Sequence, residues 1–510
     1  MLSVHDTGAP APCPLPFNLA AHVLARAGDM PDKIALAVVA PTGSERWSYT
    51  RLEASVLGTG TGLLKAGLRP GDRVILRLGN TVDFPLAFLG AVAVGLVPVP
   101  LSAQLTAPEV GRLAAALAPA AILHDARLPL PDPAPARVIG LEALHAMRDL
   151  PPAPIRMTDP DELAYVVFTS GTSGSPRAVG HAHRAIWARR MMHGGWYGLT
   201  GTDRVLHAGA FNWTYTLGTG LLDPWSLGAT ALIPKEGTAP EALPLLMKRF
   251  DASIFAAAPG VYRKLFMHGA PPALPALRHG LAAGEKLPDA TRAAWEAATG
   301  TPVFEAFGMS ECSTFVSGSP ARPAPPGTLG YPQDGRRVAI VDDAGAPVAR
   351  GEAGIIAVSA RDPGLMLGYL GAEEATRARY RGEWFLSGDL GRMDETGAIT
   401  FLGRADDMMN AGGVRVSPIE VEGVLASHPA LAAVAVTDVE VKPDVRVIAC
   451  FYTAAQDIEE KDISDFAAER LARWKQPRLY IRTETLPTGP NGKLSRRALR
   501  QHWEATHGQA

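Results

Sequence analysis

A run rich in hydroxyl side chains and glycines occupies residues 168–179, where the sequence reads Phe-Thr-Ser-Gly-Thr-Ser-Gly-Ser-Pro-Arg-Ala-Val. Glycine tolerates positive φ angles, so such a loop can turn tightly and present backbone N–H groups to an anion. The hydroxyl groups can add hydrogen bonds to phosphate oxygens, and Arg177 can add a charge-assisted one. The sequence therefore predicts a phosphate-binding loop formed by Thr169, Ser170, Gly171, Thr172, Ser173 and Gly174.

This loop differs from the Walker A pattern, because Gly171 and Gly174 lie too close together and no Lys-Ser or Lys-Thr pair follows them. A polar turn that solvates itself is the simpler alternative for so short a motif. The apolar run over residues 163–168 is typical of a buried strand, so we expect the loop to hang from a rigid sheet edge.

Further motifs follow in the second half of the chain, and their order matters. They read Phe-Gly-Met-Ser-Glu at 307–311, Trp-Phe-Leu-Ser-Gly-Asp at 384–389, Gly-Arg-Ala-Asp-Asp at 403–407, Gly-Gly-Val-Arg at 412–415, Pro-Ile-Glu-Val-Glu at 418–422 and Gly-Lys at 492–493. Together with the loop, this set resembles the adenylate-forming superfamily, which contains acyl-CoA synthetases, luciferases and peptide-synthetase adenylation domains. The resemblance extends from about Phe17 to Arg497.

The resemblance implies a reaction in two halves. A carboxylate attacks the α-phosphate of ATP to give acyl-AMP and pyrophosphate, and the acyl group then passes to coenzyme A. Because the reactants are anions, we expect cations, Mg²⁺ and backbone dipoles at the site rather than a strong base. The expected ligands are therefore ATP, Mg²⁺, coenzyme A and a small-molecule carboxylate.

The resemblance also assigns catalytic and metal-binding roles. Lys493 matches the lysine that would bridge the carboxylate and the α-phosphate, although a lysine after a glycine is more often a solvent-exposed charge. Glu311 matches the Mg²⁺ ligand, and the hydroxyl of Thr169 is a second candidate ligand. Arg177 stands where the family usually has lysine, and we expect it to keep the phosphate-binding role.

Other matched residues are expected to bind the nucleotide or coenzyme A. Phe307 offers a π-face for adenine, and Asp389 can accept hydrogen bonds from both ribose hydroxyls. Gly413 would let the thin pantetheine arm pass close to the backbone. The rest of this expected set is Gly284, Glu285, Lys286, Gly308, Ser310, Arg404 and Arg415.

The acyl pocket is expected around residues 211–215, which read Phe-Asn-Trp-Thr-Tyr. Amino-acid-activating members typically carry aspartate at the second position, and Asn212 offers no charge to a substrate ammonium group. The bulky and small residues of this region suggest a modest apolar pocket lined by Trp213, Tyr215, Ala258 and Ala283. Plain core packing is an equally good interpretation of the two aromatic rings.

We therefore expect a small or medium monocarboxylic acid as substrate: aromatic, alicyclic or short aliphatic. The finer resemblance is to benzoate- or cyclohexanecarboxylate-type CoA ligases. Two alternatives stay open, namely an enzyme that loads a separate carrier protein and a luciferase-like oxygenase. A non-catalytic nucleotide-binding protein would be expected to have lost Lys493 or Glu311, and both are present.

The elements that must position these residues alternate along the chain. Short β-rich runs at 34–39, 73–78, 120–124, 164–168 and 229–233 are separated by Ala/Leu-rich helical stretches. This alternation predicts parallel sheets with crossover helices. From Arg336, short strands at 337–341, 354–358 and 397–402 between Gly/Asp turns predict a small β-barrel-like unit.

After residue 403 the pattern predicts a helix over 417–428, strands at 432–437 and 445–452, and a helix over 462–473. We therefore expect an α/β fold. Its large N-terminal domain (1–403) would contain two α/β subdomains and the β-barrel-like unit. A small, mobile α+β C-terminal domain (404–510) would carry the catalytic lysine and turn about a hinge near Asp406.

Composition narrows the class of protein. The 510 residues include 49 basic and 51 acidic side chains, a formal net charge of −2 that gives no indication of a nucleic acid or an anionic membrane as partner. The three cysteines, Cys13, Cys312 and Cys450, are too far apart to indicate a disulfide framework or a zinc site.

Residues 84–101 are apolar, but their prolines and glycines favour a buried helix followed by a strand over a membrane span. The first 17 residues lack a basic segment followed by an apolar one, so we expect no signal peptide and a cytoplasmic protein without membrane insertion. The sequence does not indicate the oligomeric state, and a homodimer is compatible with it.

Overall fold

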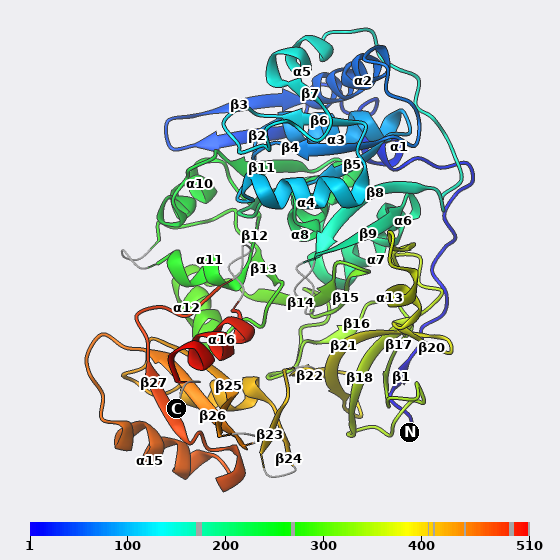
Figure 1. The fold of residues 1–510 in the computed structure, drawn as a ribbon. Coiled ribbons are helices and arrows are strands. Elements are labelled where there is room, and N and C mark those ends of the chain that lie inside the picture. The colour runs from blue at the N-terminus through cyan, green and yellow to red at the C-terminus, as the bar shows by residue number, and fades with distance from the viewer. Residues whose placement is uncertain are drawn as a thin grey trace. The chain divides into compact units, whose positions relative to one another are not determined.

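The computed structural model describes residues 1–169, 176–266, 271–405, 407–411, 414–442, 445–488 and 494–507 (Figure 1). The chain divides into two compact units. The larger unit comprises His5–Val338 and Val358–Phe385, and the smaller unit comprises Met1–Val4, Ala339–Ala357 and Leu386–Ala510.

A nine-stranded sheet is the largest element of the larger unit. Its strands in spatial order are β16 (Tyr331–Pro332), β15 (Ser313–Ser317), β14 (Val303–Met309), β13 (His279–Ala283), β12 (Ile254–Ala257), β10 (Arg204–His207), β11 (Thr230–Pro234), β2 (Ile34–Ala40) and β3 (Gly43–Ser48). The strands from β14 to β2 run parallel, as the alternation of strands and helices predicts.

Crossover helices cover this sheet with apolar faces. Trp295 of α12 (Asp289–Thr299) and Tyr262 of α11 (Pro259–Lys264) pack on Phe255 of β12, in a buried cluster that also contains Leu246 and Met247 of α10 (Leu243–Arg249). Burial of these side chains fixes the sheet, and with it the positions at which its strands end.

A second sheet of four parallel strands has the order β5 (Val97–Pro100), β4 (Arg73–Arg77), β6 (Ala121–His124) and β7 (Arg137–Gly140). Helices α2 (Tyr49–Lys65), α3 (Asp83–Ala93), α4 (Ala107–Leu117) and α5 (Leu141–Met147) belong to this region (Figure 1). Every residue of α3 is buried, and β5 follows it, so the expectation of a buried helix and a strand within 84–101 is confirmed.

A short antiparallel sheet carries the predicted phosphate loop. It consists of β8 (Leu163–Thr169), β9 (Arg177–Ala182) and β19 (Gly368–Tyr369), with β9 in the middle. Val166 of β8 and Ala178 of β9 share a buried cluster with β4, β5 and β6, so both strands that flank residues 170–175 are packed in the core.

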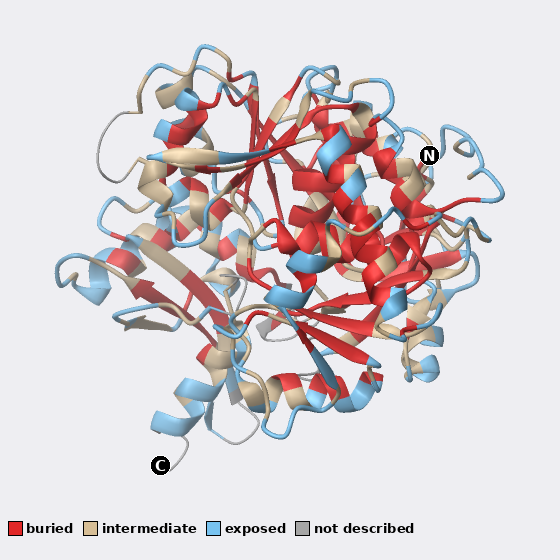
Figure 2. Cartoon of the chain, turned by 90° about the horizontal axis from the view of Figure 1, so that it is seen from above, coloured by how far each residue is buried: buried red, intermediate tan, exposed pale blue. Residues whose placement is uncertain are grey.

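Short helical segments complete the larger unit. They are α1 (Leu19–Leu24), α6 (Arg184–Ala188), α7 (Arg190–Met192), the π-helical turns η1 (His193–Tyr197) and η2 (Gly218–Leu222), α8 (Thr214–Leu217), α9 (Asp223–Leu227), η3 (Pro240–Ala242) and α13 (Glu373–Arg377). Together with the sheets they hold most of the buried residues, while exposed residues concentrate in the connecting loops (Figure 2).

The strands predicted from Arg336 onward lie in a six-stranded sheet. Its order is β1 (Val4–His5), β17 (Val338–Val341), β18 (Ala353–Ser359), β21 (Trp384–Met393) and β20 (Tyr380–Arg381), with β22 (Ile399–Arg404) also paired to β21. The division between the two units passes through β1, β17, β18 and β21.

The rest of the smaller unit is an α+β assembly. Strands β25 (Ala433–Lys442), β26 (Val445–Thr453) and β27 (Leu479–Arg482) form one sheet, and β23 (Met409–Ala411) pairs with β24 (Val414–Val416). Its helices are α14 (Pro418–Leu425), α15 (Glu460–Arg470), the 3₁₀ turn η4 (Arg473–Lys475) and α16 (Arg496–His507). Ser417 caps α14, because its side chain accepts a hydrogen bond from the Glu420 N–H.

The structure differs from the sequence-based elements in several places. The helix predicted over 462–473 ends at Arg470, because Leu471 adopts an extended backbone. The two-residue strand β1 was not predicted, since two residues give no periodicity.

In the part of the chain that the structure describes, every helix is too short or too polar to cross a bilayer.

Candidate functional site

Several predicted site residues lie just beyond the carboxyl ends of parallel strands in the nine-stranded sheet. Trp213 follows β10, Ala258 follows β12, Gly284 follows β13 and Glu311 follows β14. Because these strands run in the same direction, the four segments leave the sheet at one edge. In open α/β sheets, ligands bind at this edge, so the sheet gathers residues that lie up to a hundred positions apart in the sequence.

Glu311 lies at the tip of a tight β-hairpin. Strands β14 and β15 are antiparallel neighbours, and the connection between them is Ser310-Glu311-Cys312. Gly308 is required in this hairpin, since a Cβ atom there would lie 2.2 Å from the Ser313 carbonyl oxygen and 2.4 Å from the Thr314 Cα. Ser313 itself has a φ of 66°, a left-handed conformation that costs free energy in any residue with a Cβ atom.

Three side chains from other elements hold this hairpin. The Tyr369 hydroxyl donates a hydrogen bond of 2.6 Å to Glu311 Oε1, and His181 Nε2 lies 2.8 Å from the Ser310 carbonyl oxygen. Arg189 Nη1 donates to the Ser313 hydroxyl, and this hydrogen bond helps to offset the strain at that position. The conformation of the Glu311 hairpin is therefore set from outside the hairpin.

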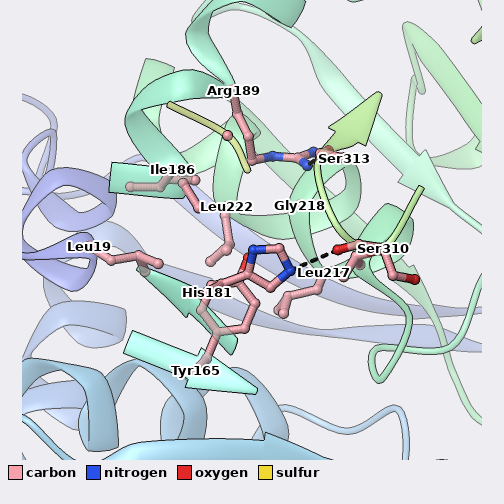
Figure 3. Close-up of a pocket in the computed structure, with 13 residues that line it drawn as sticks. Leu19, Tyr165, His181, Ile186, Arg189, Leu217, Gly218, Leu222, Ser310 and Ser313 are labelled. Carbon is pink, nitrogen blue, oxygen red and sulfur yellow. Dashed lines mark hydrogen bonds between the residues drawn. The ribbon is translucent and has the colours of Figure 1, made fainter. Parts of the chain in front are cut away.

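A small cavity of about 20 Å³ lies behind the hairpin (Figure 3). His181 and Arg189 border it, together with Tyr165 and the backbone of Gly218, and its volume suffices for about one water molecule. The His181 Nδ1 has no hydrogen-bond partner among the described residues, so a water there would satisfy it. Burial lowers the pKa of His181 to about 4, so the ring is neutral near pH 7 and its Nε2–H donates to the Ser310 carbonyl.

Arg189 is fixed in turn by a buried ion pair. Its Nη2 lies 2.6 Å from Asp223 Oδ2, and the Tyr197 hydroxyl donates to the same oxygen at 2.8 Å. Gly218 leaves room for the guanidinium, because a Cβ atom at this position would lie 2.1 Å from Arg189 Cζ. Sequence reasoning missed this pair, since neither residue belongs to a recognisable motif.

The structure brings Arg177 close to the Glu311 hairpin. Arg177 begins β9, and its guanidinium carbon lies 5.0 Å from the ring centroid of Tyr369, whose hydroxyl reaches Glu311. Thr169 ends β8 directly opposite Arg177 in the antiparallel pair. Two predicted catalytic residues, Glu311 and Arg177, thus contact one tyrosine that the sequence motifs did not indicate, and the predicted metal ligand Thr169 lies beside Arg177.

The predicted acyl-pocket residues are partly brought together. Trp213, Tyr215 and Ala283 belong to one apolar cluster, whereas Ala258 caps α11 outside it and is half-buried. The Trp213 ring lies against Gly284, where a Cβ atom would be 2.5 Å from Trp213 Cζ2.

Tyr215 is anchored in the core. Its hydroxyl donates to the Leu281 carbonyl oxygen at 2.9 Å, so the core-packing interpretation fits Tyr215 better than Trp213. Asn80, which sequence reasoning missed, holds the preceding segment: its side chain donates to the Gly209 carbonyl at 2.7 Å and accepts from the Phe211 N–H at 3.0 Å.

The other residues of the larger unit that are predicted to bind the nucleotide are close in the sequence to those described above. They are at least partly exposed. Lys286 is exposed and Glu285 is half-exposed, in the loop after β13. Phe307 is half-buried, with its ring edge-to-face against Phe315 at 5.4 Å.

The smaller unit holds the predicted ribose ligand. Asp389 of β21 lies opposite Arg404 of β22, and Arg404 Nε is 3.6 Å from Asp389 Oδ1. Arg415 lies in β24. The predicted residues Ser170, Gly171, Thr172, Ser173, Gly174, Asp406, Gly413 and Lys493 lie outside the described residues.

The donor groups fit a hard divalent cation. Mg²⁺ is usually bound by one or two carboxylates, with water and substrate phosphates completing its shell. Glu311 supplies such a carboxylate and Thr169 a hydroxyl, and both side chains are half-buried. The described residues contain no cluster of three or more His, Cys, Asp or Glu that could hold a metal without such help.

Comparisons with known proteins agree with this geometry. Residues 24–370 match the AMP-binding enzyme family, and residues 420–493 match the AMP-binding enzyme C-terminal domain. The chain is 30% identical over 489 residues to a benzoate–CoA ligase of Thauera aromatica, covering 89% of this chain and 90% of that protein.

Two solved structures are similar over nearly their whole length. An anthranilate CoA ligase in complex with anthranoyl-AMP has a TM-score of 0.87 at 26% identity, covering 96% of this chain and 98% of that one. A benzoate CoA ligase from Burkholderia xenovorans LB400 has a TM-score of 0.85 at 27% identity, with coverages of 95% and 100%. These likenesses confirm the predicted α/β fold with a large N-terminal and a small C-terminal domain.

Proposed function

The chain belongs to the AMP-binding enzyme family, and from that premise we propose that it couples a small or medium monocarboxylic acid to coenzyme A through an acyl-AMP intermediate. In this reaction ATP is cleaved to AMP and pyrophosphate. The observation that carries the proposal is the contact of Tyr369 with both Glu311 and Arg177, next to the predicted phosphate loop, with Thr169 paired to Arg177 on the neighbouring strand.

The charges of the described residues suit the adenylation half-reaction. Arg177 supplies a permanent positive charge at the end of the loop, where the pyrophosphate leaving group would carry negative charge. Glu311 and Thr169 would hold Mg²⁺, which when bound offsets phosphate charge as a Lewis acid. The hairpin anchors keep the Glu311 carboxylate in place before substrate arrives.

Residues outside the described set are given their roles by family membership. We assign the bridging of carboxylate and α-phosphate to Lys493, and the cradling of the β- and γ-phosphates to residues 170–174. We place the boundary between the N-terminal domain (1–403) and the C-terminal domain (404–510) at the hinge residue Asp406. A cytoplasmic location suits these roles, because ATP and coenzyme A are both available there.

We further propose an aromatic acid as the preferred substrate. Trp213 lies on Gly284 and would close the apolar pocket at a short distance from the reacting carboxylate, which favours compact acids over long acyl chains. Two of the similar proteins carry benzoate in their names and a third carries anthranilate, which supports the same choice.

The test is pyrophosphate release and AMP formation over a panel of acids, with and without coenzyme A. The panel contains benzoate, anthranilate, cyclohexanecarboxylate, butyrate, palmitate and phenylalanine. We expect turnover that requires coenzyme A and is highest for the aromatic acids. Adenylation without turnover on coenzyme A would indicate a carrier-protein acceptor, and a product that requires oxygen would indicate a luciferase-like oxygenase.

A further inference from the structure

We propose that Tyr369 is a positioning residue that orients the Glu311 carboxylate for the metal ion, and that Arg177 stacks on its ring to tie this carboxylate to the phosphate loop. The inference rests on the proposed function, because it takes Glu311 as the ligand of Mg²⁺. It adds to the expected site a residue and a coupling that the motifs do not contain.

Burial of the side chain and hydrogen bonds of the backbone both fix the position of Tyr369. Its side chain is buried, and its strand β19 pairs with Val179 of β9, two residues after Arg177. The Tyr369 N–H donates to Thr376 Oγ1 at 2.9 Å, and the Leu370 N–H donates to the Ala178 carbonyl at 2.8 Å. The Tyr369 hydroxyl is therefore held in one position, because its backbone cannot shift without breaking the hydrogen bonds of the sheet.

The backbone of Glu311 is fixed to the same segment. The Met366 N–H donates to the Glu311 carbonyl oxygen at 2.7 Å, while the Tyr369 hydroxyl donates to Oε1 at 2.6 Å. Two contacts at the main chain and the carboxylate define the rotamer of the side chain between them. Since Mg²⁺ demands near-ideal octahedral geometry, the direction of a single protein carboxylate strongly affects its affinity.

The aromatic ring of Tyr369 favours arginine over lysine at position 177. A planar guanidinium stacks on an aromatic face, and at 5.0 Å from the Tyr369 centroid the Arg177 guanidinium is within the range of a cation–π contact. A lysine ammonium, which the family usually has at this position, is compact and strongly hydrated and would not stack in this way. The ring thus contacts the cation of the phosphate loop and, through its hydroxyl, the metal ligand.

The experiment measures binding of ATP by titration calorimetry, with and without Mg²⁺, in Tyr369→Phe and in Arg177→Lys. Tyr369→Phe keeps the ring and removes only the hydroxyl. We expect the Kd of MgATP to rise by about tenfold or more, because a hydrogen bond to a charged group is lost, while binding of metal-free ATP changes by less than about twofold. Arg177→Lys is expected to weaken both forms, since it changes a phosphate contact as well as the stack.

Tyr331→Phe is the matched control, because Tyr331 also lies under an arginine, with Arg322 Cζ 3.3 Å from its ring centroid, and its strand β16 pairs with β15 at Ser317, away from Glu311 and Arg177. Its Mg²⁺ dependence is expected to equal that of the unsubstituted protein. A second readout, the Mg²⁺ concentration that gives half-maximal pyrophosphate release, should rise by about five- to tenfold in Tyr369→Phe alone.

The outcomes separate the inference from the proposed function. If Mg²⁺ strengthens ATP binding equally in Tyr369→Phe and in the unsubstituted protein, the inference is overturned and the proposed function stands. If the unsubstituted protein does not bind ATP, or if Mg²⁺ has no effect on it, the proposed function fails. Circular dichroism spectra establish that each variant is folded, and should Tyr369→Phe not fold, Arg177→Lys must still weaken MgATP binding or the inference is rejected.

Discussion

Two carboxyl groups of strand β14 and its hairpin differ because their surroundings differ. Glu311 is half-buried and faces the Tyr369 hydroxyl, whereas Glu305 is buried inside the sheet. Glu305 accepts hydrogen bonds from the Leu287 N–H at 3.0 Å and from Arg292 Nη2 at 3.1 Å. Burial raises the pKa of Glu305 to about 7, against the opposing pull of the Leu287 N–H and Arg292. Glu305 thereby holds the loop after Gly284 through the Leu287 N–H, and its raised pKa makes the stability of the protein depend on pH.

We predict that Glu305→Gln removes that pH dependence. The folded-state pKa of about 7 lies above the ordinary value of 4.5, so the folded protein binds this proton more tightly than the unfolded chain. The stabilisation is complete below pH 4.5 and is lost as the pH rises toward 7. The free energy of unfolding of the unsubstituted protein, compared with that of Glu305→Gln, should therefore fall by up to about 3 kcal/mol over this pH interval.

Urea denaturation at pH 5, 6, 7 and 8 measures this difference. Glu296→Gln, an exposed position on α12, is the control and should track the unsubstituted protein at every pH. The prediction would be contradicted if the free energy of unfolding changed with pH in the same way in Glu305→Gln and in the unsubstituted protein. Glu305 would then have the same pKa in the folded and the unfolded state.

At the same scale, the sequence indicates the groups that we propose to contact substrate, but not the groups that hold them in position. Glu311 and Arg177 stand in motifs, so their residue types and spacing predict chemistry. Tyr369, Arg189 and His181 cannot be recognised in this way, because they contact the hairpin across 58, 124 and 129 residues. Only the fold brings them together.

Among the elements, the β14–β15 hairpin leaves no room for a side chain at Gly308. A Cβ atom at Gly308 would meet backbone atoms of Ser313 and Thr314, which cannot rotate away as a side chain would. We predict that Gly308→Ala destabilises the protein by about 1–3 kcal/mol and displaces the Glu311 tip, lowering the rate of adenylate formation by about tenfold or more.

Thermal unfolding measures the loss of stability. Pyrophosphate release in a reaction with benzoate as the acid measures the rate of adenylate formation. Gly28→Ala is the matched control, because a Cβ atom there has no neighbour within 4 Å. A Gly308→Ala variant with the control's melting temperature and adenylation rate would show that the hairpin can relax.

Long apolar elements are the ones that the sequence predicts well. The runs at 34–39 and 164–168 fall within β2 and β8, because burial of a continuous apolar run leaves few alternatives. The two-residue strand β19 has no such signal, and it exists only because β9 offers it a free edge. The strand that pairs with β9 was therefore beyond prediction from the sequence.

For the whole molecule, the question is how one chain performs two half-reactions. The larger unit contains Glu311, Arg177 and Trp213, and the segment 404–510 contains the sequence around Lys493. Adenylation needs a cation between two anions, the carboxylate and the α-phosphate. Thioester formation starts from acyl-AMP, in which the carboxylate has already lost its charge, and needs no such bridge. A residue that serves only the first step should therefore be dispensable for the second.

We predict that Lys493→Ala abolishes acyl-AMP formation and spares thioester formation from supplied acyl-AMP. The first is measured by pyrophosphate release from acid and ATP, and the second by acyl-CoA formation from synthetic benzoyl-AMP. Lys461→Ala, which removes an exposed charge on α15, is the control and should leave both rates unchanged. An equal loss of both half-reactions in Lys493→Ala would contradict the bridging role, because a lysine needed for folding or for general nucleotide binding would affect both steps alike.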